Sequence, residues 1–265
     1  MAICNTVYEN EVIASQLKDN LATRFNARNY MTIDNELAES AGMIKKIHTY
    51  KYEGKVEVLA EGQGNTVRGK ITFDPAPYEV VTAQQVFDYT DEEFMQDPKV
   101  VDYGVAGASN EMVNDITKKY FDELKKANMS IEYTNFSYDT VVDGIALMNL
   151  EDESGLFLIV GNDLKATIRK DADFKSKELG KVIADGAVGT LCGVPVIVSK
   201  YVGEGEAYLA TKEAITLFTK KDNEVEQDRD KEKRKNTVIL RMVNLVALTD
   251  ATKVVKFVKQ VWLNK

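Results

Sequence analysis

Histidine and cysteine are nearly absent from this 265-residue sequence, which holds one histidine, His48, and two cysteines, Cys4 and Cys192. Metal sites and disulfide frameworks need several such residues at defined spacing, and no such pattern occurs here. The residues alone leave a Cys192–His48 catalytic pair open, but both cysteines are better explained as reduced, and Cys192 as a packed thiol. We therefore predict no metal-binding, cofactor-binding or catalytic residue, and no enzymatic activity.

Long hydrophobic runs are also missing, because no apolar stretch reaches the roughly 18 residues that suggest a membrane-spanning helix. The first residues, Met1 to Asn10, lack the basic and apolar regions of a signal peptide. We therefore expect a protein that is made and kept in a cytosol and that has no membrane partner.

Basic residues are not in excess: 34 Lys and Arg stand against 42 Asp and Glu, which gives a net charge of −8. This balance does not suggest a protein that grips nucleic acid through its phosphates. The glycines Gly186, Gly189 and Gly193 match neither common phosphate-loop motif, and the run after them, Val194–Val198, predicts a strand instead of a helix. Tight turns explain these glycines better than a phosphate site does.

The central stretch of the chain, Lys181 to Val202, is predicted to form strand, turn and strand. Asp185-Gly186 favours a tight turn because glycine adopts a positive φ without a clash. The β-branched run Val194–Val198 predicts a buried strand, with Pro195 at its start or on a sheet edge.

A second buried strand is predicted upstream, at Leu156–Val160. A short helix, Leu164–Lys170, follows it, with Asn162 or Asp163 as the N-cap. Together with the central stretch, these segments predict a mixed α/β unit.

Three other helices are predicted between Thr90 and Leu150. Thr90 caps a short one whose first turn is acidic. The most strongly patterned helix runs from about Ser109 to Asn128, and its apolar stripe indicates packing on a sheet. A third spans Tyr138–Leu150. The stripe of the second helix consists of Met112, Val113, Ile116, Tyr120, Leu124 and Ala127.

Several strands are expected to close the fold. The charge-rich run Lys220–Lys235 is interpreted mainly as a solvated face, with a strand at Glu224–Asp230. The other predicted strands are Ala207–Ala210, Ala214–Phe218, Thr237–Val243, Leu245–Leu248 and Val254–Val258.

A long hairpin is predicted between Ile44 and Val81, because strand-like alternation flanks a glycine-rich tip at Glu61–Asn65. A lone hairpin is only marginally stable, so one of this length is expected to lean on something. The hairpin contains four basic residues, Lys51, Lys55, Arg68 and Lys70. Their charge suits contact with the carboxylates of a neighbour. A solvated hairpin with ordinary surface charge explains the same residues equally well.

The first 44 residues predict one or two short amphipathic helices. The spacing of Leu17, Leu21 and Phe25 indicates one, and that of Ile33 and Leu37 indicates another. A helical cap on the chain's own core is one interpretation of this pattern.

In this order the segments resemble the major capsid proteins of tailed bacteriophages, whose fold is shared with the encapsulin nanocompartments. The resemblance covers most of residues 45 to 258. It rests on the helix Tyr138–Leu150, the strand Leu156–Val160 with its Gly-Asn-Asp end, Lys170–Phe174, Ile183–Gly189, Gly193–Ser199, Glu224–Asp230 and Val246–Asp250.

The resemblance implies an α+β fold with four parts. These are an N-terminal arm (1–44), an extended β-hairpin loop (45–81), a peripheral domain (82–138 and 219–265) whose long spine helix lies on an antiparallel sheet, and an axial mixed α/β domain (139–218).

The resemblance also implies a function in the virion. Copies of the chain would form hexamers and pentamers of an icosahedral shell, assembled in the host bacterial cytoplasm around double-stranded DNA without sequence-specific binding. A scaffolding protein, a portal and decoration proteins are the other expected partners, and the scaffold is expected to be a separate chain because no scaffolding-length segment precedes the hairpin.

Some members of the family cross-link a loop lysine to a neighbour's asparagine. Lys55 or Lys70, with Asn65 nearby, are candidates that match no family motif residue by residue, so no catalytic residue is assigned.

Two alternatives stay open at this point. An encapsulin shell uses the same fold to enclose a cargo enzyme, and a cytosolic α/β enzyme or ligand-binding protein can share the order of the motifs. A deep pocket that holds several polar groups with shifted pKa values would favour the enzyme.

Overall fold

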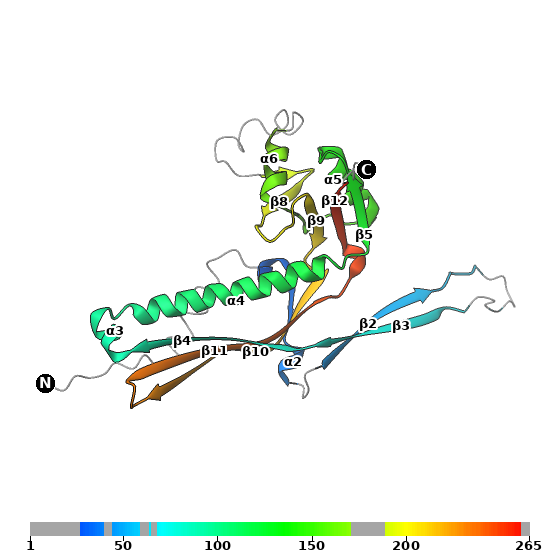
Figure 1. Ribbon diagram of the computed structural model, residues 1–265. Helices are drawn as coiled ribbons and strands as arrows, with labels where there is room; N and C mark the ends of the chain where they lie inside the picture. The colour runs from blue at the N-terminus through cyan, green and yellow to red at the C-terminus, as the bar shows by residue number, and fades with distance from the viewer. Residues whose placement is uncertain (1–26, 40–43, 59–63, 65–67, 171–188, 261–265) are drawn as a thin grey trace, which may run out of the picture.

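The computed structural model describes residues 27–39, 44–58, 64, 68–170 and 189–260. Figure 1 shows a long helix lying along a sheet, a second unit above one end of that helix, and a hairpin that projects from the sheet. The elements in chain order are η1 (Ala27–Tyr30), β1 (Thr32–Asp34), α2 (Glu36–Glu39), β2 (Ile44–Glu53), β3 (Lys70–Glu79), β4 (Val81–Thr90), α3 (Asp91–Gln96), α4 (Val100–Leu124), β5 (Met129–Tyr133), α5 (Tyr138–Met148), β6 (Leu156–Val160), α6 (Asn162–Lys170), β7 (Thr190–Leu191), β8 (Val194–Val198), β9 (Glu206–Thr211), β10 (Ile215–Asp230), β11 (Lys235–Leu248), η2 (Ala251–Lys253) and β12 (Val254–Lys259).

A four-stranded sheet in the order β1-β10-β11-β4 supports helix α4. Strands β10, β11 and β4 are antiparallel neighbours, and β1 pairs in parallel with residues 216–218 of β10. The helix buries one continuous stripe against this sheet because its apolar residues recur every three or four positions. The stripe consists of Val101, Val105, Ala108, Met112, Ile116, Tyr120 and Leu124.

Helix α4 begins nine residues earlier than predicted, at Val100 instead of Ser109, and ends at Leu124. Two glycines in the added part disfavour a helix locally, but Val101 and Val105 continue the buried stripe and packing decides the outcome. Gly104 is needed for close approach, since a Cβ there would lie 2.4 Å from the ring of Phe87. The expected Thr90 cap of α3 is confirmed, with Glu93 N donating to Thr90 Oγ1 at 3.2 Å, and the Glu93 side chain completes a capping box by accepting from Thr90 N.

A six-stranded sheet in the order β5-β12-β9-β6-β8-β7 forms the second unit. All five residues of β6 are buried, and they alternate between two cores. Leu156, Leu158 and Val160 face the core beneath α5, whereas Phe157 and Ile159 belong to the core of α4. One strand therefore joins the two units through its opposite faces.

Two sheet memberships differ from the predicted division of the chain. Residues 215–218, expected in the unit of residues 139–218, pair with β11 in the four-stranded sheet. Residues 254–258, expected with the other part, pair with β9 and β5 in the six-stranded sheet. Alternation along a strand shows which faces are buried but not which neighbour pairs, so the pattern gave no sign of either exchange.

The N-terminal region departs from the expected helix over Ile33 and Leu37. Ile33 lies in strand β1 and is exposed, while Leu37 lies in the one-turn helix α2 and is buried. The predicted helix around Leu17, the turn at Asp185-Gly186 and Trp262 lie outside the described residues. The strand Val194–Val198 is confirmed, with Pro195 near its start.

We predict opposite effects for two glycine-to-alanine changes in helices. A Cβ at Gly144 of α5 would lie 2.4 Å from Cζ of Phe257, a fully buried ring. Gly144→Ala should lower the free energy of unfolding by about 1–3 kcal/mol because the core is overpacked. Gly107→Ala, where α4 faces open space, should raise it by about 0.5–1 kcal/mol. Urea denaturation of both variants measures this, and equal stabilisation by the two would contradict the packing described.

Candidate interaction surfaces

The hairpin formed by β2 and β3 is a separate two-stranded sheet that projects from the body (Figure 1). Its ten pairs run without interruption from Ile44 opposite Glu79 to Glu53 opposite Lys70, which confirms the predicted hairpin. Beyond the last pair, the side chains of Val56 and Val58 are 97% and 99% exposed. These two apolar side chains lie far from either core and are accessible to another molecule.

One cross-strand pair near its base fastens the hairpin to the body. Lys45 and Tyr78 face each other in the ladder. Lys45 Nζ lies 5.1 Å from the ring centroid of Phe218 in β10 and 3.2 Å from the Glu36 carboxylate. These contacts tie strand β2 to both α2 and the four-stranded sheet.

Tyr78 ties the other strand to helix α4. Lys126 Nζ lies 5.7 Å from the centroid of the Tyr78 ring and also bonds the buried carboxylate of Glu123. Glu123 in turn accepts a hydrogen bond from the backbone of Leu248 at 3.4 Å. Burial, and next the charge of Glu123, raise the pKa of Tyr78, so the ring stays neutral at physiological pH.

The basic side chains of the hairpin are available for a partner. Lys55, Arg68 and Lys70 are exposed, and none makes an ion pair with a described residue. The side chains of Lys51 and Asn65 lie outside the described residues. Contact of the three cations with a neighbour's carboxylates stays a prediction.

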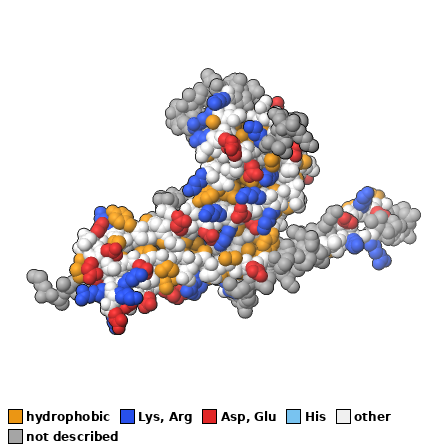
Figure 2. Space-filling model, viewed as in Figure 1, with side chains coloured by type: hydrophobic (Ala, Val, Ile, Leu, Met, Phe, Trp, Pro, Cys, Tyr) orange, Lys and Arg blue, Asp and Glu red, His pale blue; other side chains and the backbone are white. Residues whose placement is uncertain are grey.

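The far end of the β10–β11 pair is charged and solvated, as predicted for Lys220–Lys235. Arg241 lies between Glu224 and Glu226, at 3.6 and 3.9 Å, and Lys235 lies 2.6 Å from Asp88. A hydrogen bond from Lys235 lowers the pKa of Asp88, so this carboxylate is ionised at neutral pH. Figure 2 shows acidic and basic side chains interspersed along this side of the body. Exposed pairs of this kind add little stability, so they mainly keep the surface soluble.

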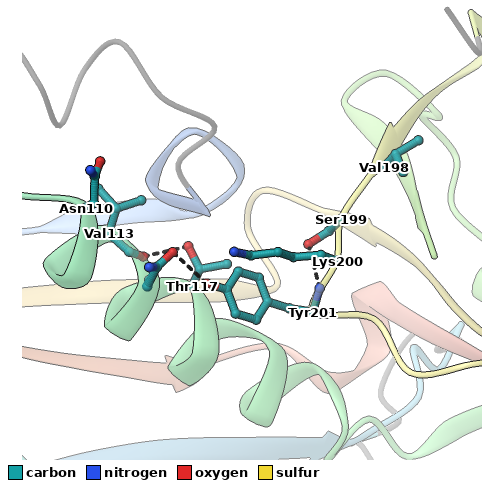
Figure 3. A pocket seen from close by; sticks show the side chains of 8 residues that line it. Asn110, Val113, Thr117, Val198, Ser199, Lys200 and Tyr201 are labelled. Carbon is teal, nitrogen blue, oxygen red and sulfur yellow. Dashed lines mark hydrogen bonds between the residues drawn. The ribbon is translucent and has the colours of Figure 1, made fainter. Parts of the chain in front are cut away.

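A hollow of about 450 Å³ lies between α4 and the chain that follows β8 (Figure 3). Tyr201 Oη donates to Asn114 Oδ1 at 2.6 Å across this junction, and Lys200 Nζ lies 5.1 Å over the Tyr201 ring. The hollow is lined by Asn110, Val113, Asn114, Thr117, Val198, Ser199, Lys200 and Tyr201. These amide, hydroxyl and amine groups lie at the junction of the two units, and the side chains that line the hollow include no carboxylate, imidazole or thiol.

A second hollow, of about 600 Å³, lies beside α6 and the β12 strand. Tyr133 Oη donates to the carbonyl of Gly205 at 2.9 Å, and Gly205 N donates to Asp163 at 2.7 Å. Burial raises the pKa of Tyr133 to about 12. A tyrosine that is harder to deprotonate and already bonded to the backbone is suited to a structural role.

The one histidine and the described cysteine do not come together. His48 lies in β2 of the projecting hairpin, whereas Cys192 lies in the turn between β7 and β8 of the second unit (Figure 1). Cys192 Sγ contacts the carbonyl of Tyr138 at 3.7 Å. Among the described residues, no three His, Cys, Asp or Glu side chains gather as metal ligands, and none of the helices is both long and apolar enough to cross a membrane.

We predict that Glu206 stabilises the second unit in a pH-dependent way. Burial alone would raise its pKa, but hydrogen bonds from Lys256 and Tyr208, both at 2.9 Å, outweigh that effect and lower the pKa. Glu206→Gln should reduce the free energy of unfolding by about 1 kcal/mol at pH 7.

The difference between the two proteins should persist above the unfolded pKa of about 4.3 and disappear as the pH falls through the lower folded value. Urea titrations at several pH values measure it. The exposed Glu204→Gln serves as control and should show little difference at any pH. A difference for Glu206→Gln that grows on acidification would overturn this account.

We also predict that Tyr78 holds the hairpin against the body. Tyr78→Ala should accelerate tryptic cleavage after Lys45 and Lys46 about tenfold, because opening the hairpin base becomes easier, while cleavage sites in the body are unaffected. Tyr78→Phe keeps the ring under Lys126 and should behave as the parent. Equal protection in the alanine variant would show that the hairpin is held elsewhere.

The amino-acid sequence is similar to a known protein family. Residues 74–257 match the model of a family described as phage capsid protein. The major capsid protein of Staphylococcus phage phiMR11 is 26% identical over 265 residues, covering 94% of this chain and 92% of that relative.

Solved structures share the fold at low sequence identity. The mature capsid of bacteriophage PhiM1 superposes with a TM-score of 0.70 at 10% identity, covering 88% of this chain and 86% of that one. A virus-like particle from Pyrococcus furiosus gives a TM-score of 0.61 at 12% identity, covering 95% and 100%.

The fold thus agrees with the tailed-phage capsid fold expected from the sequence. The family match and the curated relative both favour a phage capsid over the encapsulin and enzyme alternatives. Since the family model spans more than half of the sequence, the chain belongs to the phage capsid protein family.

Proposed function

We propose that this chain is the major subunit of an icosahedral shell that encloses the double-stranded DNA of a phage. The observation that carries the proposal is the β2–β3 hairpin, whose base is fastened to the body while its outer valines lie in solvent. An isolated chain gains nothing from such an extension. A neighbouring copy would bury it.

The mechanism would be mechanical. The hairpin projects from one end of the body and α3 lies at the other (Figure 1), so contact between successive copies is heterologous and can close into hexamers and pentamers. In this proposal α4 and the four-stranded sheet form the peripheral domain, and the six-stranded sheet with α5 and α6 forms the axial domain near the five-fold and six-fold centres. The hairpin of β2 and β3 is the extended loop, whereas η1 and β1, which fall within the predicted arm of residues 1–44, pack with the body.

The partners follow from the same proposal. Copies of the chain would be the main partner, with a scaffolding protein, a portal and decoration proteins joining during assembly in the host cytoplasm. The net charge of −8 suits a shell that confines DNA without gripping it, since like charge leaves the genome mobile.

Electron microscopy of the protein, alone and co-expressed with the other head proteins of its phage, tests the proposal. Closed particles built from this chain are expected. Soluble monomers under every condition would contradict it.

We predict that removal of the hairpin tip separates folding from assembly. Replacing residues 54–69 with a two-residue Asn-Gly turn keeps Glu53 opposite Lys70 and should leave circular dichroism and the melting temperature nearly unchanged, because the replaced residues lie beyond the last pair of the ladder. Particle formation should be lost or much reduced. Substituting Val56→Ser and Val58→Ser at constant loop length should weaken assembly by a smaller amount. Normal particles from the deletion would show that the tip makes no contact between subunits.

A further inference from the structure

The free edges of the sheets differ in how well they are protected against pairing with another strand. Strand β4 is the last strand of the four-stranded sheet, and its ten residues pair with β11 in unbroken register from Val81 to Thr90. Its other edge has no strand partner among the described residues. The short edge strands β1, β5 and β7 offer at most five residues each.

The turn after β4 shows which residues of this strand form main-chain hydrogen bonds with β11. Asp91 N donates to the carbonyl of Arg234 at 3.1 Å, and these two residues continue the β4–β11 register by one step. Residues alternate along an antiparallel strand between bonding their partner and facing away from it. Odd-numbered residues of β4 therefore bond β11, and even-numbered ones face the free edge.

Four even-numbered residues present unused main-chain groups at that edge: Thr82, Gln84, Val86 and Asp88. The fifth, Thr90, already donates its N–H to Glu93 in the capping box at 2.9 Å. No described residue forms a backbone hydrogen bond to the other four. The edge thus offers a run of donors and acceptors about 20 Å long, at about 3.4 Å per residue.

The other long edge of this sheet is protected in the ways that natural proteins use. Of residues 219–230 of β10, eight are charged, and the register with β11 shifts twice between Thr219 and Glu224. Charges and bulges both discourage a further strand. Strand β4 has one charged residue in ten, no proline and no bulge.

The hairpin has the same asymmetry between its two outer edges. Pro75 and Pro77 in β3 face His48 and Lys46 of β2. Proline has no N–H to donate, so within a ladder it occupies positions that face away from the partner strand, and the outer edge of β3 lacks two donors. The outer edge of β2 is free of proline over its ten residues. The main-chain N–H and C=O groups of its even-numbered residues, such as His48, point away from β3.

We propose that the free edge of β4 accepts strand β2 from the hairpin of a second copy, so that main-chain hydrogen bonds extend one sheet across two subunits. This proposal rests on the proposed function, since it names the surface on which the projecting hairpin docks. Among the described residues, β4 and β2 each offer an outer edge of ten residues without proline or bulge, and Figure 1 places these edges at opposite ends of the body. Pairing one with the other uses both and repeats from copy to copy.

Charge favours this pairing over pairing of like strands. The sequence of β2 contains Lys45, Lys46 and Lys51, so two β2 strands side by side would repel. The carboxylates at the end of β4 and the start of α3 are paired with cations of their own chain, Asp88 with Lys235, Asp91 with Arg229 and Glu92 with Arg234, so charge acts mainly against the pairing of two β2 strands.

Hydrogen exchange read residue by residue tests the proposal. In the dissociated chain the amides of Thr82, Gln84, Val86 and Asp88 should exchange rapidly while those of Phe87 and Gln85 are protected. In assembled particles the four even-numbered amides should slow about 100-fold or more, because they become hydrogen-bonded. Particles in which these amides still exchange rapidly overturn this proposal and leave the proposed function standing, whereas the absence of particles overturns both.

Proline substitutions identify the occupant. Gln84→Pro removes an outward N–H from β4 and His48→Pro removes one from β2, and neither position bonds its own ladder. Each should raise the protein concentration needed for assembly at least about tenfold. Gln84→Ala and His48→Ala keep the N–H and should change it less than about twofold. Thr82→Pro repeats the β4 test at a second site, with melting temperature checked for each variant.

The two strands should fail together if they pair with each other. Any particles that His48→Pro still forms should have lost the protection of the even-numbered β4 amides. Protection that persists in this variant would mean that β4 pairs with another β4 or with a different segment, and would overturn the proposal. Assembly of both proline variants at the parent's concentration would overturn it too.

Discussion

The burial of one face of α4 against β10, β11 and β4 is the contact on which the rest of the molecule depends. The helix is about 37 Å long at 1.5 Å per residue, and its stripe from Val101 to Leu124 is closed off from solvent along that length. The helix and the four-stranded sheet therefore form a stiff body, and the other elements are attached to it at defined places.

The second unit is attached through shared packing instead of a flexible linker. Phe157 and Ile159 of β6 lie in the core of α4, and the rings of Phe121 and Tyr208 approach to 6.3 Å across the same boundary. Close-packed interiors resist rotation because a small displacement loses many contacts. The orientation of this unit relative to α4 and the four-stranded sheet is thus set within the chain, before any neighbour is present. A subunit that repeats with one geometry requires this.

The sequence predicted the parts of this fold that local patterns encode. The hairpin followed from alternation around Gly62 and Gly64, and the N-cap of α3 from Thr90 and the acidic turn after it, because each signal lies within a few residues. The start of α4 was missed because Gly104 and Gly107 weaken the local helix signal that the buried Val101 and Val105 override. Strand β12 belongs to the six-stranded sheet because it pairs with β5, in which Met129 lies 126 residues before its partner Val255. No local sequence pattern reveals a pairing over that distance. Family resemblance supplied the function, since composition and spacing alone left enzyme and shell protein open.

Surface contacts were the least predictable feature, and the reason is physical. The anchor at Lys45 and Tyr78 uses Phe218 and Lys126, which come from two distant parts of the chain, so its members share no spacing. Edge protection is different, because charges in β10 and prolines in β3 can be seen in the sequence once the pairing is known. A subunit that must join copies of itself has to leave some main-chain groups unpaired, yet every unpaired edge also invites wrong partners. Blocking the two unsuitable edges while leaving the other two open resolves this conflict, since specificity then comes from the pairings that are prevented as much as from the one that is formed.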